Sequence, residues 1–110
     1  MVHWLYLRKE VVIMPTYIAL FKSTEQGVRD IKEAPGHIEE ALKGIEAVGG
    51  KVIGFYAGMG EYDFVGIAEF PSDEVQMAFS LSVASGGGVR ATTLKAFSKE
   101  EFAGIVKKMP

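Results

Sequence analysis

The sequence lacks cysteine and asparagine altogether, although it has 110 residues. Without cysteine the chain forms no disulfide, offers no thiolate to a metal ion and has no cysteine nucleophile. The missing cysteines fit a reducing compartment, where disulfides are rare in any case. Asparagine and cysteine are both thermolabile, so their joint absence favours a thermophilic source.

The chain is also short of net charge and of long apolar runs. Its 12 basic and 14 acidic residues leave a net charge of −2, and the lysines and arginines are scattered along the chain. Nucleic-acid binding therefore has little electrostatic support. The apolar residues 2–7 are interrupted at Arg8, far short of the roughly 20 residues of a membrane span, and they lack the order of a signal peptide. We expect a soluble cytoplasmic protein with neither a membrane nor a nucleic-acid partner.

The length suits one domain rather than two. The tripeptide at 14–16 looks like a second chain start, so we interpret residues 1–13 as an N-terminal extension and residues 14–110 as a single domain. An alternative for the extension is a strand at a sheet edge, because residues 11–13 are β-branched.

Apolar periodicity and turn signals predict four strands and four helices. Ser23 and Gln26 have the spacing of a capping box, and Pro35 with Gly36 is expected to break the first helix from the second. The expected elements, in chain order, are a strand at 16–22, a short helix ending near Ala34, a helix at 36–48, strands at 51–57 and 62–70, a helix at 73–84, a strand at 89–97 and a final helix with a capping box of Ser98 and Glu101.

The order β-α-β-β-α-β, followed by one more helix, is typical of a ferredoxin-like α+β fold with a split βαβ arrangement. We expect a four-stranded antiparallel sheet with both long helices on one face, plus a C-terminal helix. Alternate residues of the third strand point to opposite faces, and both sets are apolar at their centres. One set is Phe64, Gly66, Ala68 and Phe70, and the other is Asp63, Val65, Ile67 and Glu69.

An antiparallel sheet that is open to water on one side alternates apolar and polar residues. The face away from the helices is therefore expected to be covered, most simply by the same face of a second subunit. The helix at 73–84 supports this expectation, because residues 75–84 carry no charge and apolar residues surround its axis. We expect a homodimer or a higher homo-oligomer.

Three blocks of the sequence, in this order, resemble the GYD-domain family. They are residues 14–21 (MPTYIALF), residues 50–63 with the tetrapeptide GEYD at their end, and residues 89–97 followed by EEF at 100–102. The resemblance covers residues 14–108. It implies a ferredoxin-like domain that pairs sheet to sheet as a dimeric α/β barrel, and it implies no known activity.

The tetrapeptide at 60–63 is the most distinctive local feature. Gly60 permits a positive φ at the exit of the hairpin, and Tyr62 and Asp63 then point to opposite faces of the sheet. In one interpretation, Asp63 lies at the mouth of a barrel cavity as a proton acceptor or a ligand anchor. In the other, Asp63 accepts backbone N–H bonds in the turn.

Arg90, on the last strand, is the candidate for clamping a carboxylate ligand, because its guanidinium fork matches two oxygens. The alternative is a salt bridge with Asp63, Glu69 or a partner subunit. Tyr17 and Tyr56 are candidates for lining a ligand cavity, although aromatic residues on strands more often belong to the core.

His37 and Glu40 lie three residues apart on one predicted helix. A single pair of this kind needs further ligands to hold a metal ion, so we interpret it as a solvated helix face and predict no metal. The glycine run at 86–88 ends a helix and precedes a strand, which is the reverse of a phosphate loop. We predict no cofactor.

Three functions remain open. The first is a homo-oligomeric protein that binds a small molecule between two sheets without catalysis. The second is a cofactor-free oxygenase-like or isomerase-like enzyme of the dimeric α/β-barrel class, which rests on fold analogy. Its polar groups would be Asp63, Tyr62, Arg90 and His37, with Asp63, Tyr62 and His37 as catalytic candidates. The third is an effector-sensing module that acts through a partner protein.

Overall fold

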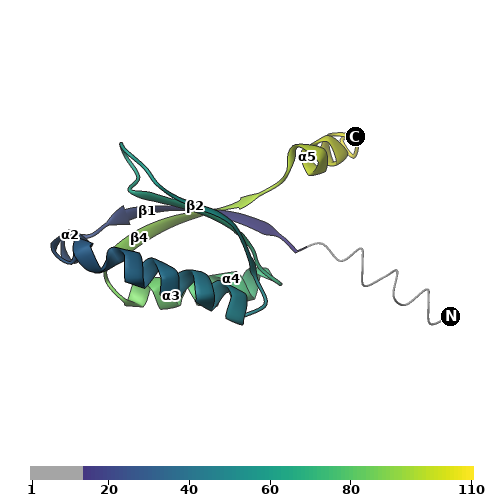
Figure 1. Ribbon diagram of the computed structural model, residues 1–110. Helices are drawn as coiled ribbons and strands as arrows, with labels where there is room; N and C mark the ends of the chain where they lie inside the picture. The colour runs from purple at the N-terminus through teal and green to yellow at the C-terminus, as the bar shows by residue number, and fades with distance from the viewer. Residues whose placement is uncertain (1–13) are drawn as a thin grey trace.

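A computed structural model describes residues 14–110 and shows one sheet with two long helices on one side of it (Figure 1). Residues 1–13 lie outside the described residues. Both interpretations of this segment, as an N-terminal extension and as an edge strand, therefore stay predictions. No helix in the described part of the chain is long and apolar enough to cross a membrane. In chain order the elements are β1 (Thr16–Ser23), α2 (Glu25–Arg29), the 3-10 helix η1 (Ile31–Glu33), α3 (Ala34–Ala47), β2 (Lys51–Ala57), β3 (Phe64–Glu69), α4 (Asp73–Ser85), β4 (Val89–Ala96) and α5 (Lys99–Val106).

The strands of the described chain form an antiparallel sheet in the order β2-β3-β1-β4. The register places Ile18 of β1 opposite Ile67 of β3 on one side and opposite Leu94 of β4 on the other. Both α3 and α4 lie below the sheet in Figure 1. This is the expected ferredoxin-like order with an additional C-terminal helix, so the predicted α+β fold of the single chain is confirmed, and the dimeric α/β barrel stays a prediction.

Local hydrogen bonds explain where two of the helices begin. Ser72 Oγ accepts a hydrogen bond from Val75 N at 3.2 Å at the start of α4. Ser98 and Glu101 form the predicted capping box of α5: Glu101 N donates to Ser98 Oγ at 3.0 Å, and Ser98 N donates to Glu101 Oε1 at 2.7 Å. These side chains satisfy backbone donors that the first helical turn leaves free.

Two predictions around the first helix are wrong. The N-cap of α2 is Thr24, whose Oγ1 accepts from Gly27 N at 3.2 Å. Ser23 does not take that role because it is the last residue of β1 and pairs with Val89 of β4. Pro35 does not separate two α-helices but lies in the first turn of α3, where its missing N–H costs no helical hydrogen bond.

The buried core lies at one end of the interface between helices and sheet. Phe70 packs edge to face against Tyr17, with 5.7 Å between ring centroids, and its centroid lies 5.5 Å from that of Phe79. The buried apolar residues are Tyr17, Ile45, Ala68 and Phe70, with Leu42, Val52, Val75 and Phe79 packed against them.

The sheet face turned away from α3 and α4 is covered by no helix of the described chain (Figure 1). We call it the outer face and define it by two rows of cross-strand neighbours. The first row is Gly54, Ile67, Ile18 and Leu94, and the second is Tyr56, Val65, Leu20 and Thr92. On this side α5 extends beyond the end of β4, and its exposed apolar side chains, with one from the segment that follows, are Phe102, Ile105, Val106 and Met109.

Candidate functional site

Asp63 fastens the hairpin of β2 and β3 to the end of β1. Its backbone N–H donates to Phe21 O at 2.8 Å, and its Oδ2 accepts from Ser23 N at 2.7 Å. Gly58 N donates to the Asp63 carbonyl at 2.9 Å, and Gly60 has the expected positive φ, +114°. The Asp63 carboxylate therefore accepts a backbone hydrogen bond from the end of β1, and not from the turn itself, where one interpretation expected its donors. Its role as a proton acceptor or ligand anchor stays a prediction.

Charged residues gather at the hairpin end of the outer face. Lys22 Nζ lies 3.6 Å from Glu61 Oε1 and 5.4 Å from the centroid of the Tyr62 ring. Arg90 is the cross-strand neighbour of Lys22, so two cations share this end of the sheet. Within the described residues Arg90 forms no ion pair. Its pairing with a ligand carboxylate or with a partner subunit stays a prediction.

Tyr17, Asp73 and Lys95 form a hydrogen-bonded chain at the other end of the sheet, on the helix side. Tyr17 Oη donates to Asp73, and Lys95 Nζ lies 3.0 Å from each carboxylate oxygen of Asp73. Burial, with a smaller contribution from the hydrogen bond to Asp73, raises the pKa of Tyr17 to about 12. The hydrogen bonds from Tyr17 and then Lys95 lower the pKa of Asp73. The three residues tie the start of α4 to β1 and β4.

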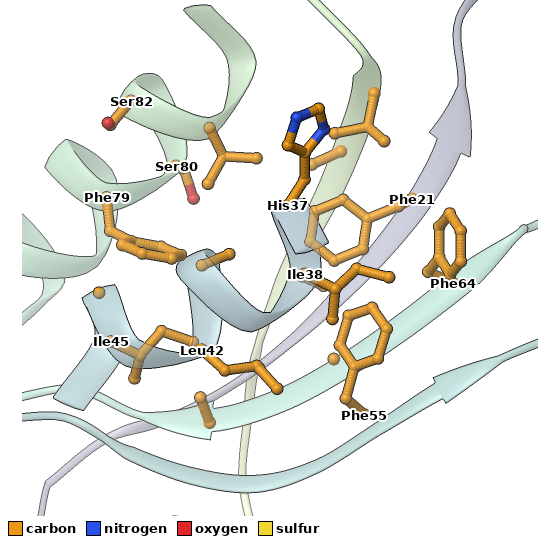
Figure 2. A pocket seen from close by; sticks show the side chains of 18 of the residues that line it. Phe21, His37, Ile38, Leu42, Ile45, Phe55, Phe64, Phe79, Ser80 and Ser82 are labelled. Carbon is orange, nitrogen blue, oxygen red and sulfur yellow. The ribbon is translucent and has the colours of Figure 1, made fainter. Parts of the chain in front are cut away.

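A cavity of about 1040 Å³ lies between the helix layer and the sheet, with α3 and α4 as its walls (Figure 2). Phe55 lies 5.8 Å from Phe64 and 6.5 Å from Phe21, measured between ring centroids, and the three rings line the cavity together. The space exists because facing positions carry small residues, namely Ala19, Gly66 and Ala91 on the strands and Ala41, Gly44 and Ala78 on the helices.

The structure separates the predicted site residues. His37 lines the cavity from α3 (Figure 2), and Tyr17 lines it from the sheet. Tyr56 lies on the outer face with 63% of its surface exposed, whereas Tyr62 and Asp63 belong to the hairpin connection. The polar groups considered for an enzyme thus do not meet in this cavity of the single chain. Their catalytic and ligand-binding roles stay predictions.

His37 and Glu40 both line the cavity from α3. The described residues contain no group of three or more histidine, aspartate and glutamate side chains placed to hold a metal ion. Among these residues the pair therefore finds no third protein ligand of that kind, which a site built on one such pair requires.

Sequence patterns did not single out Asp73 or Lys95. By sequence Asp73 is only an acidic residue at the start of a helix, and Lys95 is only a charged residue of a strand. Only the register of β1 with β4 brings Lys95 beside Tyr17. A usable signal did exist for the aromatic cluster, because strand alternation puts its members on one face: Phe21, Phe55 and Phe64.

Comparison with known proteins identifies the family. The family profile described as GYD domain matches residues 17–106, from β1 to the end of α5. The chain belongs to the GYD-domain family. A curated relative from Thermus thermophilus, the "Glutamine synthetase and cystathionine beta-lyase binding protein", is 34% identical over 84 residues, which are 76% of this chain and 88% of the relative. No solved structure gives a significant match.

The GYD-domain match confirms the resemblance that three sequence blocks suggested. It includes the tetrapeptide at 60–63, both rows of the outer face and the cavity-lining aromatic residues. The name of the Thermus thermophilus relative describes a protein that binds two enzymes. Both the outer face and the cavity are thus features of the GYD domain of this chain.

Proposed function

We propose that this GYD-domain protein is a homodimeric binding protein, in which two copies pair through their outer faces and the dimer docks onto metabolic enzymes. The observation that carries the proposal is the apolar outer face, which no helix of the described chain covers. Support for enzyme partners comes from the relative, whose name describes binding to glutamine synthetase and cystathionine beta-lyase.

The outer face is apolar where a solvated sheet face would be polar. Its central residues Ile18, Leu20 and Ile67 are neighbours across β1 and β3, and Leu94 extends the patch to the edge strand with 47% of its surface exposed. Fully burying an exposed side chain of this kind is worth about 1.5–3 kcal/mol, and these partly exposed side chains contribute a fraction of that value to a complex. A two-fold contact uses the same patch on both copies, so each of these contributions counts twice.

The C-terminal helix α5 supplies a second apolar surface. Its capping box defines where the helix begins, yet Phe102 is 61% exposed and Ile105 is 42% exposed. An amphipathic helix is stabilised by burying its apolar stripe against another element. Because α5 projects past the sheet on the side of the outer face, a second copy seated on that face provides such an element (Figure 1).

Sedimentation of purified protein tests the pairing. The wild-type chain is expected to sediment at twice its 12.0 kDa mass. Leu94→Glu and Ile67→Lys place a charge in the outer face and are expected to give monomers. Val28→Lys is the matched control, because Val28 is an exposed apolar residue of α2, away from the outer face. A wild-type protein of single-chain mass, or a Leu94→Glu dimer as tight as wild type, would contradict the proposal.

Calorimetric titration tests the enzyme partners. Purified glutamine synthetase and cystathionine beta-lyase from the source organism of this chain are titrated separately with the wild-type dimer. Saturable binding to at least one of them is expected. If neither enzyme gives a binding heat and gel filtration shows no complex, the proposal that the protein binds these enzymes is rejected. The proposal of a homodimer is tested separately, by sedimentation.

A second candidate function is small-molecule binding between the paired sheets. It is favoured by the position of Tyr56 and Arg90, which both present exposed side chains on the outer face side of the sheet. Arg90 would clamp a carboxylate through its guanidinium fork. Native mass spectrometry of the dimer tests this function, with loss of a bound small acid in Arg90→Gln as the expected result. A dimer whose mass equals that of two chains, with no additional bound molecule, would count against small-molecule binding.

A further inference from the structure

We infer that the cavity between the helix layer and the sheet binds an apolar small molecule whose polar end is uncharged or cationic, such as a long-chain alcohol or amine. The cavity lies on the helix side of the sheet, and of the two rows that define the outer face only Gly54 and Ile67 also border it. The inference therefore concerns a separate site and stands whether or not two copies pair.

The cavity has the size of a small-molecule site. Its volume of about 1040 Å³ is slightly above the range of about 300–1,000 Å³ that such sites usually occupy. Ala91 of β4 lines this space and remains exposed, so the opening reaches the sheet itself. Protein interiors are otherwise close-packed. Cross-strand neighbours such as Ala19 and Gly66 are too small to fill the space between the sheet and the helices.

Aromatic rings supply the apolar surface that a ligand would contact. Figure 2 shows Phe21, Phe55 and Phe64 on one side of the cavity, with Ile38 of α3 beside them and Phe79 of α4 on the other side. Rings of this kind bury large apolar areas and contact ligands through both their faces and their edges. An alkyl chain or a ring between the two sides would supply van der Waals contacts that these side chains do not make across the empty space.

The charged groups around the cavity restrict the polar end of the ligand. The described lining contains Asp30 and Glu40 but no lysine or arginine, and His37 lies on the same helix as Glu40. A carboxylate or phosphate head would meet like charges there with no lysine or arginine to pair with it. An ammonium or hydroxyl head would instead meet the two carboxylates and the neutral polar groups of Gln26 and Ser82.

Competition among three matched ligands tests the inference. The neutral dye Nile red is bound to the wild-type protein, and dodecylamine, dodecanol and dodecanoate are then added below their micelle concentrations. These molecules share one chain length and differ at the head group. The amine and the alcohol are expected to displace the dye, with dodecanoate needing at least about tenfold more, a difference of about 1.4 kcal/mol. Failure of the dye to bind, or stronger displacement by dodecanoate, would overturn the inference.

Two substitutions locate the binding. Ala91→Phe places a ring inside the cavity and is expected to weaken dye binding about tenfold or more. Ala84→Phe adds the same ring at an exposed position of α4 outside the lining and is expected to bind as wild type does. Circular dichroism establishes that both variants are folded. Equal dye binding by the two folded variants would place the dye elsewhere and reject the site.

Glu40→Lys tests the charge preference independently of the cavity volume. Glu40 is exposed on α3, so the substitution is compatible with the fold. The added cation is expected to raise the affinity for dodecanoate relative to that for dodecylamine. An unchanged ratio of the two affinities would show that the lining charges do not select the head group, and the inferred ligand class would fail.

Discussion

Tyr17 does two things in this domain that a single strand residue rarely combines. Its ring packs edge to face against Phe70 in the core, while its hydroxyl donates to Asp73, which Lys95 also holds. A buried tyrosine hydroxyl normally finds a hydrogen-bond partner, because leaving it unpaired is costly. Tyr17 thus belongs to the core and also borders the cavity on the helix side of the sheet, whereas its role in binding a ligand stays a prediction.

The ionisation of Tyr17 is expected to destabilise the fold in alkali. Its pKa is raised from 10.0 to about 12, so its contribution to stability is complete below pH 10 and is lost as the pH rises through 12. Tyr17→Phe is expected to remove this alkaline loss and to cost about 1 kcal/mol at neutral pH. Ultraviolet absorbance of tyrosinate measures the titration. A spectrum with every tyrosine titrating near pH 10 would contradict the prediction.

Asp63 also has a structural role, because its carboxylate accepts a hydrogen bond that joins the β2–β3 connection to the end of β1. Asp63→Ala removes the acceptor for Ser23 N and is expected to cost about 1–3 kcal/mol. Asp63→Asn keeps an oxygen that can accept the same hydrogen bond, so it is expected to lose much less. Urea unfolding compares the two variants, and hydrogen exchange at Ser23 reports the contact itself. Equal losses would mean that the negative charge matters more than the acceptor.

Among the elements, α2 owes its position to the glycine run before β4. Thr24 N donates to Gly88 O at 3.0 Å, and Thr24 Oγ1 donates to Gly87 O at 2.6 Å. Gly87 has a φ of +80°, a conformation that residues with a Cβ rarely adopt. The backbone carbonyl groups of the glycine run at 86–88 therefore hold the start of α2 in place.

The packing of α2 leads to a prediction with a matched control. A Cβ at Gly27 would overlap the carbonyl oxygen of Gly88, whereas a Cβ at Gly36 meets nothing within 4 Å. Gly27→Ala is expected to destabilise the protein by about 1–3 kcal/mol, because the backbone of the connection must move. Gly36→Ala is expected to stabilise α3 by about 0.5–1 kcal/mol. Chemical denaturation measures both, and a neutral Gly27→Ala would contradict the close contact.

Across the whole molecule, apolar surface is spread over three places rather than gathered in one core. Only four apolar residues among those described are buried, and the remaining apolar surface lines the cavity, covers the outer face or lies on α5. A domain of this size buries only about two-thirds of the surface that its unfolded chain exposes. Contacts made by a second copy or a ligand therefore add directly to its stability.

This distribution predicts that thermal stability depends on protein concentration. Dimer formation stabilises the folded chain by mass action, so the unfolding midpoint is expected to rise by a few degrees for each tenfold increase in concentration. Leu94→Glu, which places a charge on the outer face, is expected to unfold at one temperature regardless of concentration. Calorimetric scans at three concentrations measure both. A concentration-independent midpoint for the wild-type chain would speak against pairing.

Much of the fold could be predicted because its signals are local. The capping box at Ser98 and Glu101 and the positive φ of Gly49 after α3 follow from residue type and spacing within one turn. The wrong predictions at Ser23 and Pro35 arose where one local signal is compatible with two structures. Serine can cap a helix or end a strand, and proline can end a helix or lie in its first turn. Ser23 satisfied a capping pattern, but pairing with Val89 of β4 kept it in the strand. Sheet pairing outweighs one capping hydrogen bond.

The sequence by itself determined the order of the elements and the apolar character of both sheet faces, because these depend on residue patterns that repeat every few positions. It also determined the membership in the GYD-domain family, because the family profile matches the residue types along positions 17–106. Only the tertiary structure decided which distant residues meet. It placed Lys95 against Asp73, Asp63 against Ser23, and three phenyl rings around a hollow. Those contacts depend on strand register and on the distance between layers, which the summed packing of the whole chain determines.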